Sequence, residues 1–119
     1  MEHKNDDYHV RIMVGIISSK WTLPVMYALK DGTKRYHEVN KVLPDMREKV
    51  LTDTLRKLER DGLVARAVFA AVPPKVEYEL SELGKSLLDV IITLLGWTKE
   101  HVNEVHVARQ TFDSKDTTD

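Results

Sequence analysis

Residues 45–62 read DMREKVLTDTLRKLERDG, and this stretch decides the fold. Leucines at positions 51, 55 and 58 have the spacing that places one apolar stripe along a helix. The opposite side of that helix carries polar residues, also three and four positions apart, of the kind that reads bases: Lys49, Thr52, Asp53 and Arg56. The stretch is therefore predicted to be an amphipathic helix with one buried and one polar face.

The same stretch contains signals for both ends of the helix. Asp45 is predicted to be the N-cap, with Glu48 three residues later in a carboxylate variant of the capping box. Gly62 provides the C-terminal stop. By itself such a helix is most often a solvated surface helix, so its role depends on its neighbours.

The neighbours predict a winged helix-turn-helix, mainly α with a small β-wing. A short helix over 37–43, with Val39, Val42 and Leu43 facing inward, ends at Pro44, because the residue before a proline avoids helical geometry. Only a few residues separate it from the amphipathic helix, as in a helix-turn-helix. Two strands follow, at 63–69 and 76–80, joined by a stiff loop.

Two further helices are predicted before the helix-turn-helix. The first covers 8–18 and is broken or weakened near Gly15. The second covers 21–30 and has two alternative starts. With Thr22 as the N-cap, Pro24 lies in the first turn, whereas a start at Ser19 places Pro24 deeper and implies a kink.

The closing helix is predicted over about 81–110, with Ser81 as its N-cap. Its apolar residues spread over more than one face, which favours pairing with a second copy of the chain over the alternative of a central buried helix. We therefore expect a homodimer with the N- and C-terminal helices at its interface. Residues 1–7 are predicted to be flexible, 8–112 to form one winged-helix domain, and 113–119 to be a disordered tail.

Composition limits the function classes. The chain has 119 residues, 42% of them hydrophobic, and no cysteine, which excludes disulfides, thiolate catalysis and thiol redox sensing. Formal net charge is −1, yet residues 30–66 hold ten basic and seven acidic groups, a local excess that suits a phosphate-facing module. No signal peptide or membrane span is predicted, so we expect a cytoplasmic protein.

Several blocks of the chain resemble HxlR-type transcriptional regulators, which are related to the MarR type. The blocks are KWT at 20–22, KRYHEV at 34–39, LTDTLRKLERDGLV at 51–64, VPPKVEYELS at 72–81 and ELG at 82–84. The resemblance implies a homodimeric DNA-binding repressor or activator, with the recognition helix in the major groove and the wing near the backbone or minor groove. The chain departs from the pattern at Arg47 and Glu48, where a serine and a proline are common, and at Ala70 and Ala71 in the wing. It also lacks the reactive cysteine of many members.

The predicted DNA contacts divide by role. Lys49 and Arg56 would donate to guanine edges or phosphates, Thr52 to either, and Asp53 would accept from cytosine. Arg47 stands at the start of the helix, and three residues are predicted to hold the backbone: Lys34, Arg35 and Lys75. Two subunits would place these helices roughly 10 base pairs apart. No metal, cofactor or catalytic group is predicted.

Two alternatives stay open. Three aromatic residues could line an effector pocket between subunits, although ordinary core packing explains them as well: Trp21, Tyr27 and Trp97. The winged helix could also be a protein-interaction module, with its polar helix face docking a partner rather than operator DNA.

Overall fold

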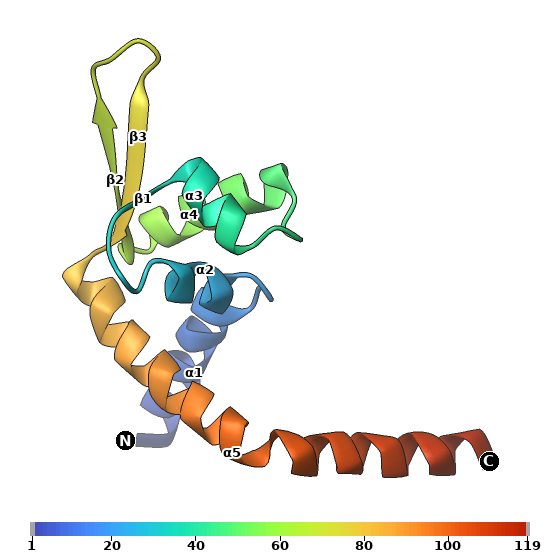
Figure 1. Ribbon diagram of the computed structural model, residues 1–119. Coiled ribbons are helices and arrows are strands. Elements are labelled where there is room, and N and C mark those ends of the chain that lie inside the picture. The colour runs from blue at the N-terminus through green and yellow to red at the C-terminus, as the bar shows by residue number, and fades with distance from the viewer. Residues whose placement is uncertain (1, 119) are drawn as a thin grey trace. The chain divides into compact units, whose positions relative to one another are not determined.

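The computed structural model describes the backbone of residues 2–118 and the side chains of residues 6–115. The structure is mainly helical with a small antiparallel sheet, and the β2–β3 hairpin projects away from α3 and α4 (Figure 1). The elements in chain order are α1 (Glu2–Ile17), α2 (Thr22–Ala28), β1 (Lys34–Arg35), α3 (Tyr36–Val42), α4 (Glu48–Arg60), β2 (Val64–Phe69), β3 (Lys75–Leu80) and α5 (Glu82–Thr118). The chain divides into two units, residues 1–88 and 89–119, which are described separately.

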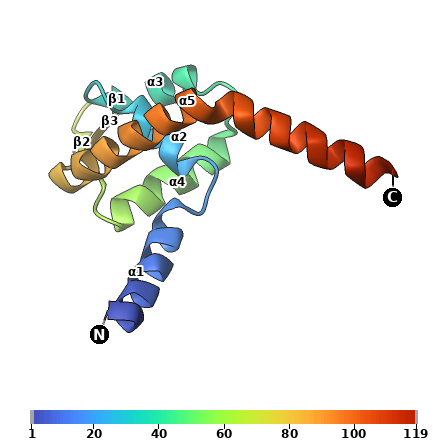
Figure 2. The ribbon, with the colours of Figure 1, turned by 90° about the horizontal axis from the view of Figure 1, so that it is seen from below.

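The core of the first unit forms around the leucine stripe of α4. Leu51, Leu55 and Leu58 are at most 1% exposed, as their spacing predicts. α2 packs against α4 (Figure 2) and contributes Val25 and Met26, both fully buried. Burial of each such side chain stabilises the fold by about 1.5–3 kcal/mol, so α4 is held mainly by its apolar side.

The turn between α3 and α4 differs from the prediction. α4 begins at Glu48 with Arg47 as N-cap and no side-chain cap, so the prediction of Asp45 as N-cap is wrong. The reason is Met46, which is 3% exposed and whose N–H donates to the Leu43 carbonyl (3.1 Å). This buried side chain fixes the turn and delays the helix by two residues. It also occupies the core beneath the turn, whereas Val42 points outward at 54% exposure, against the prediction.

The end of α4 agrees with the sequence. Gly62 has φ +76°, the left-handed conformation that favours glycine after a helix. The Gly62 N–H donates to the Glu59 carbonyl (3.0 Å) and the Leu63 N–H to the Leu58 carbonyl (2.9 Å). These two bonds form a Schellman motif, which turns the chain directly from α4 into β2.

The sheet has the strand order β1-β3-β2, with both pairings antiparallel. β2 pairs with β3 from Val64↔Leu80 to Phe69↔Lys75, and the two strands form the wing. β1 adds only two residues at the outer side of β3. The fold is therefore a winged helix-turn-helix, mainly α with a small sheet, as the sequence predicts.

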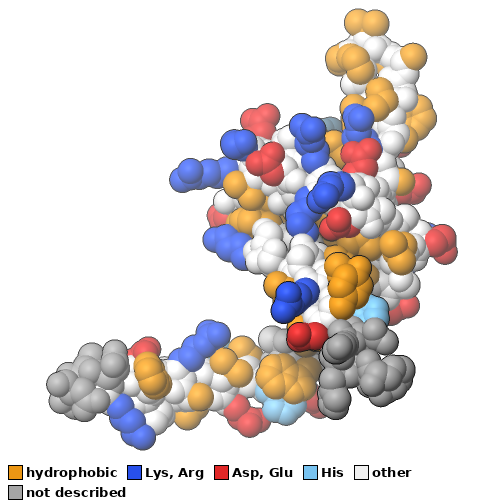
Figure 3. All heavy atoms as spheres, turned by 180° about the vertical axis from the view of Figure 1, so that it is seen from behind, with side chains coloured by type: hydrophobic (Ala, Val, Ile, Leu, Met, Phe, Trp, Pro, Cys, Tyr) orange, Lys and Arg blue, Asp and Glu red, His pale blue; other side chains and the backbone are white. Residues whose placement is uncertain are grey.

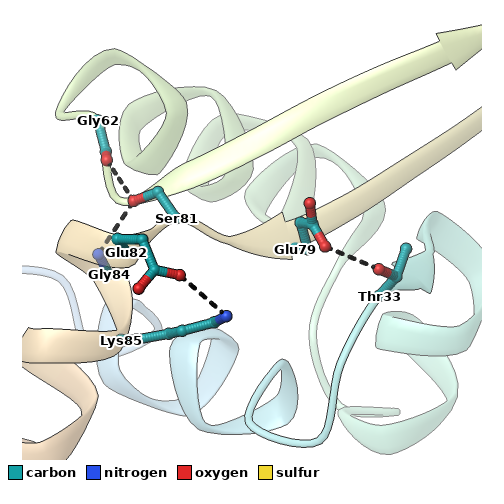
Figure 4. Close-up of polar contacts among 7 residues, drawn as sticks. All are labelled: Thr33, Gly62, Glu79, Ser81, Glu82, Gly84 and Lys85. Carbon is teal, nitrogen blue, oxygen red and sulfur yellow. Dashed lines mark hydrogen bonds and ion pairs between the residues drawn. The ribbon is translucent and has the colours of Figure 1, made fainter.

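The first turn of α5 is fixed to the end of α4 through Ser81 (Figure 4). Its hydroxyl donates to the Gly62 carbonyl (2.6 Å) and accepts from the Gly84 N–H (3.0 Å), which confirms the predicted N-cap. A Cβ at Gly84 would lie 2.0 Å from the Leu63 carbonyl oxygen. Glycine is thus required there for the close approach of α5 to the chain leaving α4.

Both terminal helices are longer than predicted. The structure assigns residues 2–7 to α1, which passes through Gly15 without a break, and residues 113–118 to α5. Extending a nucleated helix costs little, and the Arg11–Asp7 pair (3.8 Å) supports the start of α1. Residues 1 and 119, which belong to the predicted flexible ends, lie outside the described residues.

α2 begins between the two predicted alternatives. Trp21 is its N-cap and Thr22 its first residue, so Pro24 lies in the first turn and produces no kink. Within residues 2–118, no helix has the length and apolar character needed to cross a membrane.

Candidate nucleic-acid interface

The outer side of α4 is exposed, as its polar spacing predicts. Thr52, Asp53 and Arg56 are all exposed, and the Lys49 side chain is 87% accessible. Lys49 Nζ lies 3.4 Å from Asp53 Oδ2, one helical turn away. A surface pair of this kind contributes about 0–1 kcal/mol, so a ligand can separate the two charges easily.

Tyr36 fixes the start of α4 and was not identified from the sequence. Its hydroxyl donates to the Glu48 carbonyl (2.8 Å) and accepts from the Thr52 hydroxyl (3.3 Å). One side chain of α3 thus positions both the first turn of α4 and a predicted base contact. The signal that could have found it is a tyrosine at the first position of α3, because a half-buried phenol needs a hydrogen-bond partner.

The start of α3 is closed by Glu38. Its Oε1 accepts from the Arg35 N–H (2.7 Å), which satisfies one free donor of the helix. This hydrogen bond is the main cause that lowers the pKa of Glu38; burial opposes it, and the charges of His37, Lys34 and Arg35 lower the pKa further. Lys34 and Arg35 lie in β1, where they pair with Tyr78 and Glu77 of the wing.

Two of the residues predicted to contact the DNA backbone, Arg35 and Lys75, line one hollow. It measures about 260 Å³ and is lined by Arg35, Tyr36, His37, Pro74, Lys75 and Val76. Lys75 Nζ lies 3.2 Å from Glu77 Oε2 and 5.4 Å from the centre of the Phe69 ring. The start of β3, next to the wing loop, and the start of α3 therefore present basic side chains together.

A second hollow, of about 360 Å³, separates α4 from the wing. It is lined by Thr52, Arg56, Glu59, Arg66 and Tyr78. Arg66 was not among the predicted DNA contacts, and it does not pair with Glu77 or Glu79 of the neighbouring strand. Arg66 lies opposite Tyr78 in the sheet register, so it faces away from both and pairs instead with Glu59 (3.5 Å).

Charges of both signs share the surface of the first unit. Figure 3 shows Lys and Arg side chains gathered over its body with acidic side chains among them, whereas the tip of the wing carries hydrophobic ones. Val72 at this tip is fully exposed and Phe69 is 45% exposed. Apart from Lys75 at the end of the wing loop, the tip therefore offers little for contacts with phosphate, in keeping with Ala70 and Ala71 at that position.

The aromatic residues of the candidate effector pocket are not brought together within one unit. Trp21 and Tyr27 are half-buried in the first unit, where Lys30 Nζ lies 4.4 Å from the centre of the Tyr27 ring. Trp97 belongs to the second unit, is 53% exposed and stacks on His101, with ring centres 4.8 Å apart. The pocket stays a prediction.

A winged helix-turn-helix that exposes a polar α4 beside basic side chains is typical of helix-turn-helix DNA-binding proteins. Residues 16–106 match the HxlR-like helix-turn-helix family, and the chain belongs to that family. The family is one of transcriptional regulators, so DNA-binding regulation is the function that membership implies.

Relatives and solved structures agree with this assignment. The uncharacterised HTH-type transcriptional regulator YtcD of Bacillus subtilis is 41% identical over 106 residues, covering 89% of this chain and 84% of YtcD. The redox regulator HypR in its reduced form is 35% identical with a TM-score of 0.78, covering 82% of this chain and 97% of HypR. A structure assigned to the MarR family, from Enterococcus faecalis V583, is 37% identical with a TM-score of 0.72, covering 82% and 89% of the two chains. Because this chain has no cysteine, a thiol-based response cannot be transferred to it.

Proposed function

We propose that this chain is a sequence-specific transcriptional regulator that binds operator DNA as a homodimer. α4 enters the major groove, and the wing contacts the backbone or minor groove. The observation that carries this proposal is that α4 has two different faces. Its leucine side is buried, while Lys49, Thr52 and Arg56 on the other side are exposed. A helix held from one side can present the other to a groove without rearrangement.

The side chains have different roles in this proposal. Arg56 and Lys49 donate to guanine edges or phosphates, Thr52 contacts either, and Asp53 accepts from cytosine once it separates from Lys49. The residues that hold the DNA backbone are Lys34, Arg35 and Lys75, and Arg47 is a further DNA contact at the start of α4. Location in the cytoplasm stays a prediction.

The homodimer is supported by exposed apolar side chains on the two terminal helices. On α1, within the first unit, five of them are 47–62% exposed: Tyr8, Val10, Ile12, Met13 and Val14. In the part of α5 that belongs to the second unit, Val90, Ile92, Leu94 and Trp97 are 47–61% exposed. Water contact by so many apolar groups is unfavourable, and a second copy of the chain would cover them.

The competing function is a winged helix that docks a protein through α4. Binding of the full chain to mixed-sequence duplex, titrated with salt, separates the two. A DNA-binding protein gives a steep negative log–log slope, whereas a protein-docking module has little affinity at any salt concentration. Selection from a random duplex library then tests specificity, and a two-fold symmetric motif is the result expected for a dimer.

A further inference from the structure

The hollow between α4 and the wing has no role in the proposed function as stated above. Arg66 of β2 and Tyr78 of β3 line one side of it, and Thr52, Arg56 and Glu59 of α4 line the other. Arg66 Nε lies 3.5 Å from Glu59 Oε1, and the two side chains are 43% and 41% exposed. The hollow thus opens directly beside two of the proposed base contacts, Thr52 and Arg56.

The chemistry of the hollow favours an anion. It holds two guanidinium groups against one carboxylate, and a guanidinium offers the paired donors that fit a phosphate. Burial raises the pKa of Tyr78, with smaller effects of nearby Glu59 and Tyr36 in the same direction and of Arg66 in the opposite one. A tyrosine phenol is protonated at neutral pH, so Tyr78 can act as a further donor.

We propose that this hollow seats one backbone phosphate of bound DNA, held by Arg66 and Tyr78, and that Glu59 competes with that phosphate for Arg66. The inference rests on the proposed function, because it requires α4 to lie on DNA. In the free chain the Glu59 carboxylate is paired with the Arg66 guanidinium. On binding, Arg66 transfers to the phosphate and the Glu59 carboxylate returns to water.

The energetics permit this exchange. An ion pair that is about two-fifths exposed contributes only about 0–1 kcal/mol to stability, so breaking it is inexpensive. A hydrogen bond from a guanidinium to a phosphate is charge-assisted and shorter than the 3.5 Å of the present pair. Glu59 therefore lowers the affinity for every DNA sequence, and its removal should raise that affinity.

The test measures the salt dependence of binding to mixed-sequence duplex for the full chain and its variants. Arg66→Gln should reduce the magnitude of the log–log slope by about one, while Arg66→Lys keeps it. Glu59→Gln should raise the affinity about two- to fivefold, and this gain should vanish in the Arg66→Gln background. The matched controls are Glu82→Gln and Lys85→Gln, which break a pair of 3.2 Å in the first turn of α5 (Figure 4) and should change neither slope nor affinity.

Each other outcome overturns the inference. An unchanged slope for Arg66→Gln means that Arg66 meets no phosphate, and a gain from Glu59→Gln that persists without Arg66 means that Glu59 acts only by general repulsion. Both results leave the proposed function standing, whereas a wild-type chain with no salt-dependent binding would contradict both the inference and the proposed function.

Competition by inorganic phosphate, at constant ionic strength, is a further experiment. If phosphate weakens DNA binding by the wild type but not by Arg66→Gln, phosphate and DNA compete for the hollow, as the inference requires, whereas equal weakening of both means that phosphate acts outside the hollow and counts against it. Thermal unfolding of each variant verifies that it is folded.

Discussion

Several basic side chains at the candidate interface already form ion pairs in the free chain. Lys49 pairs with Asp53, Lys75 with Glu77, and Arg66 with Glu59. Exposed pairs of this kind are weak, so they orient the cations without preventing their transfer to phosphate. They also lower the net charge of the surface, which is how a chain of net charge −1 can present cations to DNA without being basic overall.

Arg56 is exposed on α4 and, within residues 6–115, forms no ion pair with an acidic side chain. If it reads a base, Arg56→Ala should weaken binding to the selected operator by about 1–3 kcal/mol and relax the preference at one position. Lys75→Ala should instead weaken binding to all sequences alike, because a phosphate contact carries no sequence information. Both are measured at one fixed salt concentration, and unchanged operator affinity in the two variants would contradict the assignment.

Glu38 gives a pH-dependent prediction. Its folded pKa lies below the usual 4.5, so the stability from its bond to the Arg35 N–H is present above that value and is lost as pH falls through the folded pKa. Glu38→Gln should reduce the slope of unfolding free energy against pH below about pH 5, by at most about one proton. Urea unfolding at a series of pH values measures this, and parallel curves for the variant and the wild type would exclude the linkage.

At the scale of elements, the entry into α5 depends on one glycine. Gly84→Ala would place a Cβ against the Leu63 carbonyl, and since backbone must then shift, we expect a loss of about 1–3 kcal/mol in the free energy of unfolding. Ser86→Ala, an exposed position in the same helix, should change it by less than about 0.5 kcal/mol. Denaturant unfolding of the pair provides the comparison, and equal effects would show that the close approach tolerates a methyl group.

The elements themselves were predictable because their signals are local. The leucine spacing of α4, the stop at Gly62, the cap at Ser81 and the two strands after α4 depend on residues near one another in sequence. The start of α4 was not predictable from Asp45, because it is set by burial of Met46, which is a tertiary effect. Tyr36 and Arg66 were missed for the same reason, since their partners become neighbours only through the α3–α4 packing and the β2–β3 register.

At the scale of the whole molecule, the proposed function requires two chains, because one α4 reads only a half-site. The exposed apolar side chains of α1 and of residues beyond Asp89 are where we expect the second chain to bind. Leu94, which is 51% exposed, offers a test on α5. Covering a half-exposed leucine contributes about half of the roughly 1.5–3 kcal/mol of a fully exposed one, and a symmetric dimer covers it twice, so replacing it with a charge should raise the dimer dissociation constant at least about tenfold.

Leu94→Glu should therefore shift the chain toward monomer in sedimentation experiments at micromolar concentration. It should also weaken binding to a two-fold symmetric operator far more than binding to an isolated half-site, because the second α4 is lost while the first is untouched. Asn103→Glu is the matched control, since it adds the same charge to an exposed position on the side of α5 that carries Asp89 and Glu100, and it should alter neither mass nor operator affinity. A Leu94→Glu chain that keeps the wild-type mass would place the interface elsewhere. If that chain were monomeric yet kept full operator affinity, one copy of α4 would suffice, and the requirement for two chains would be wrong.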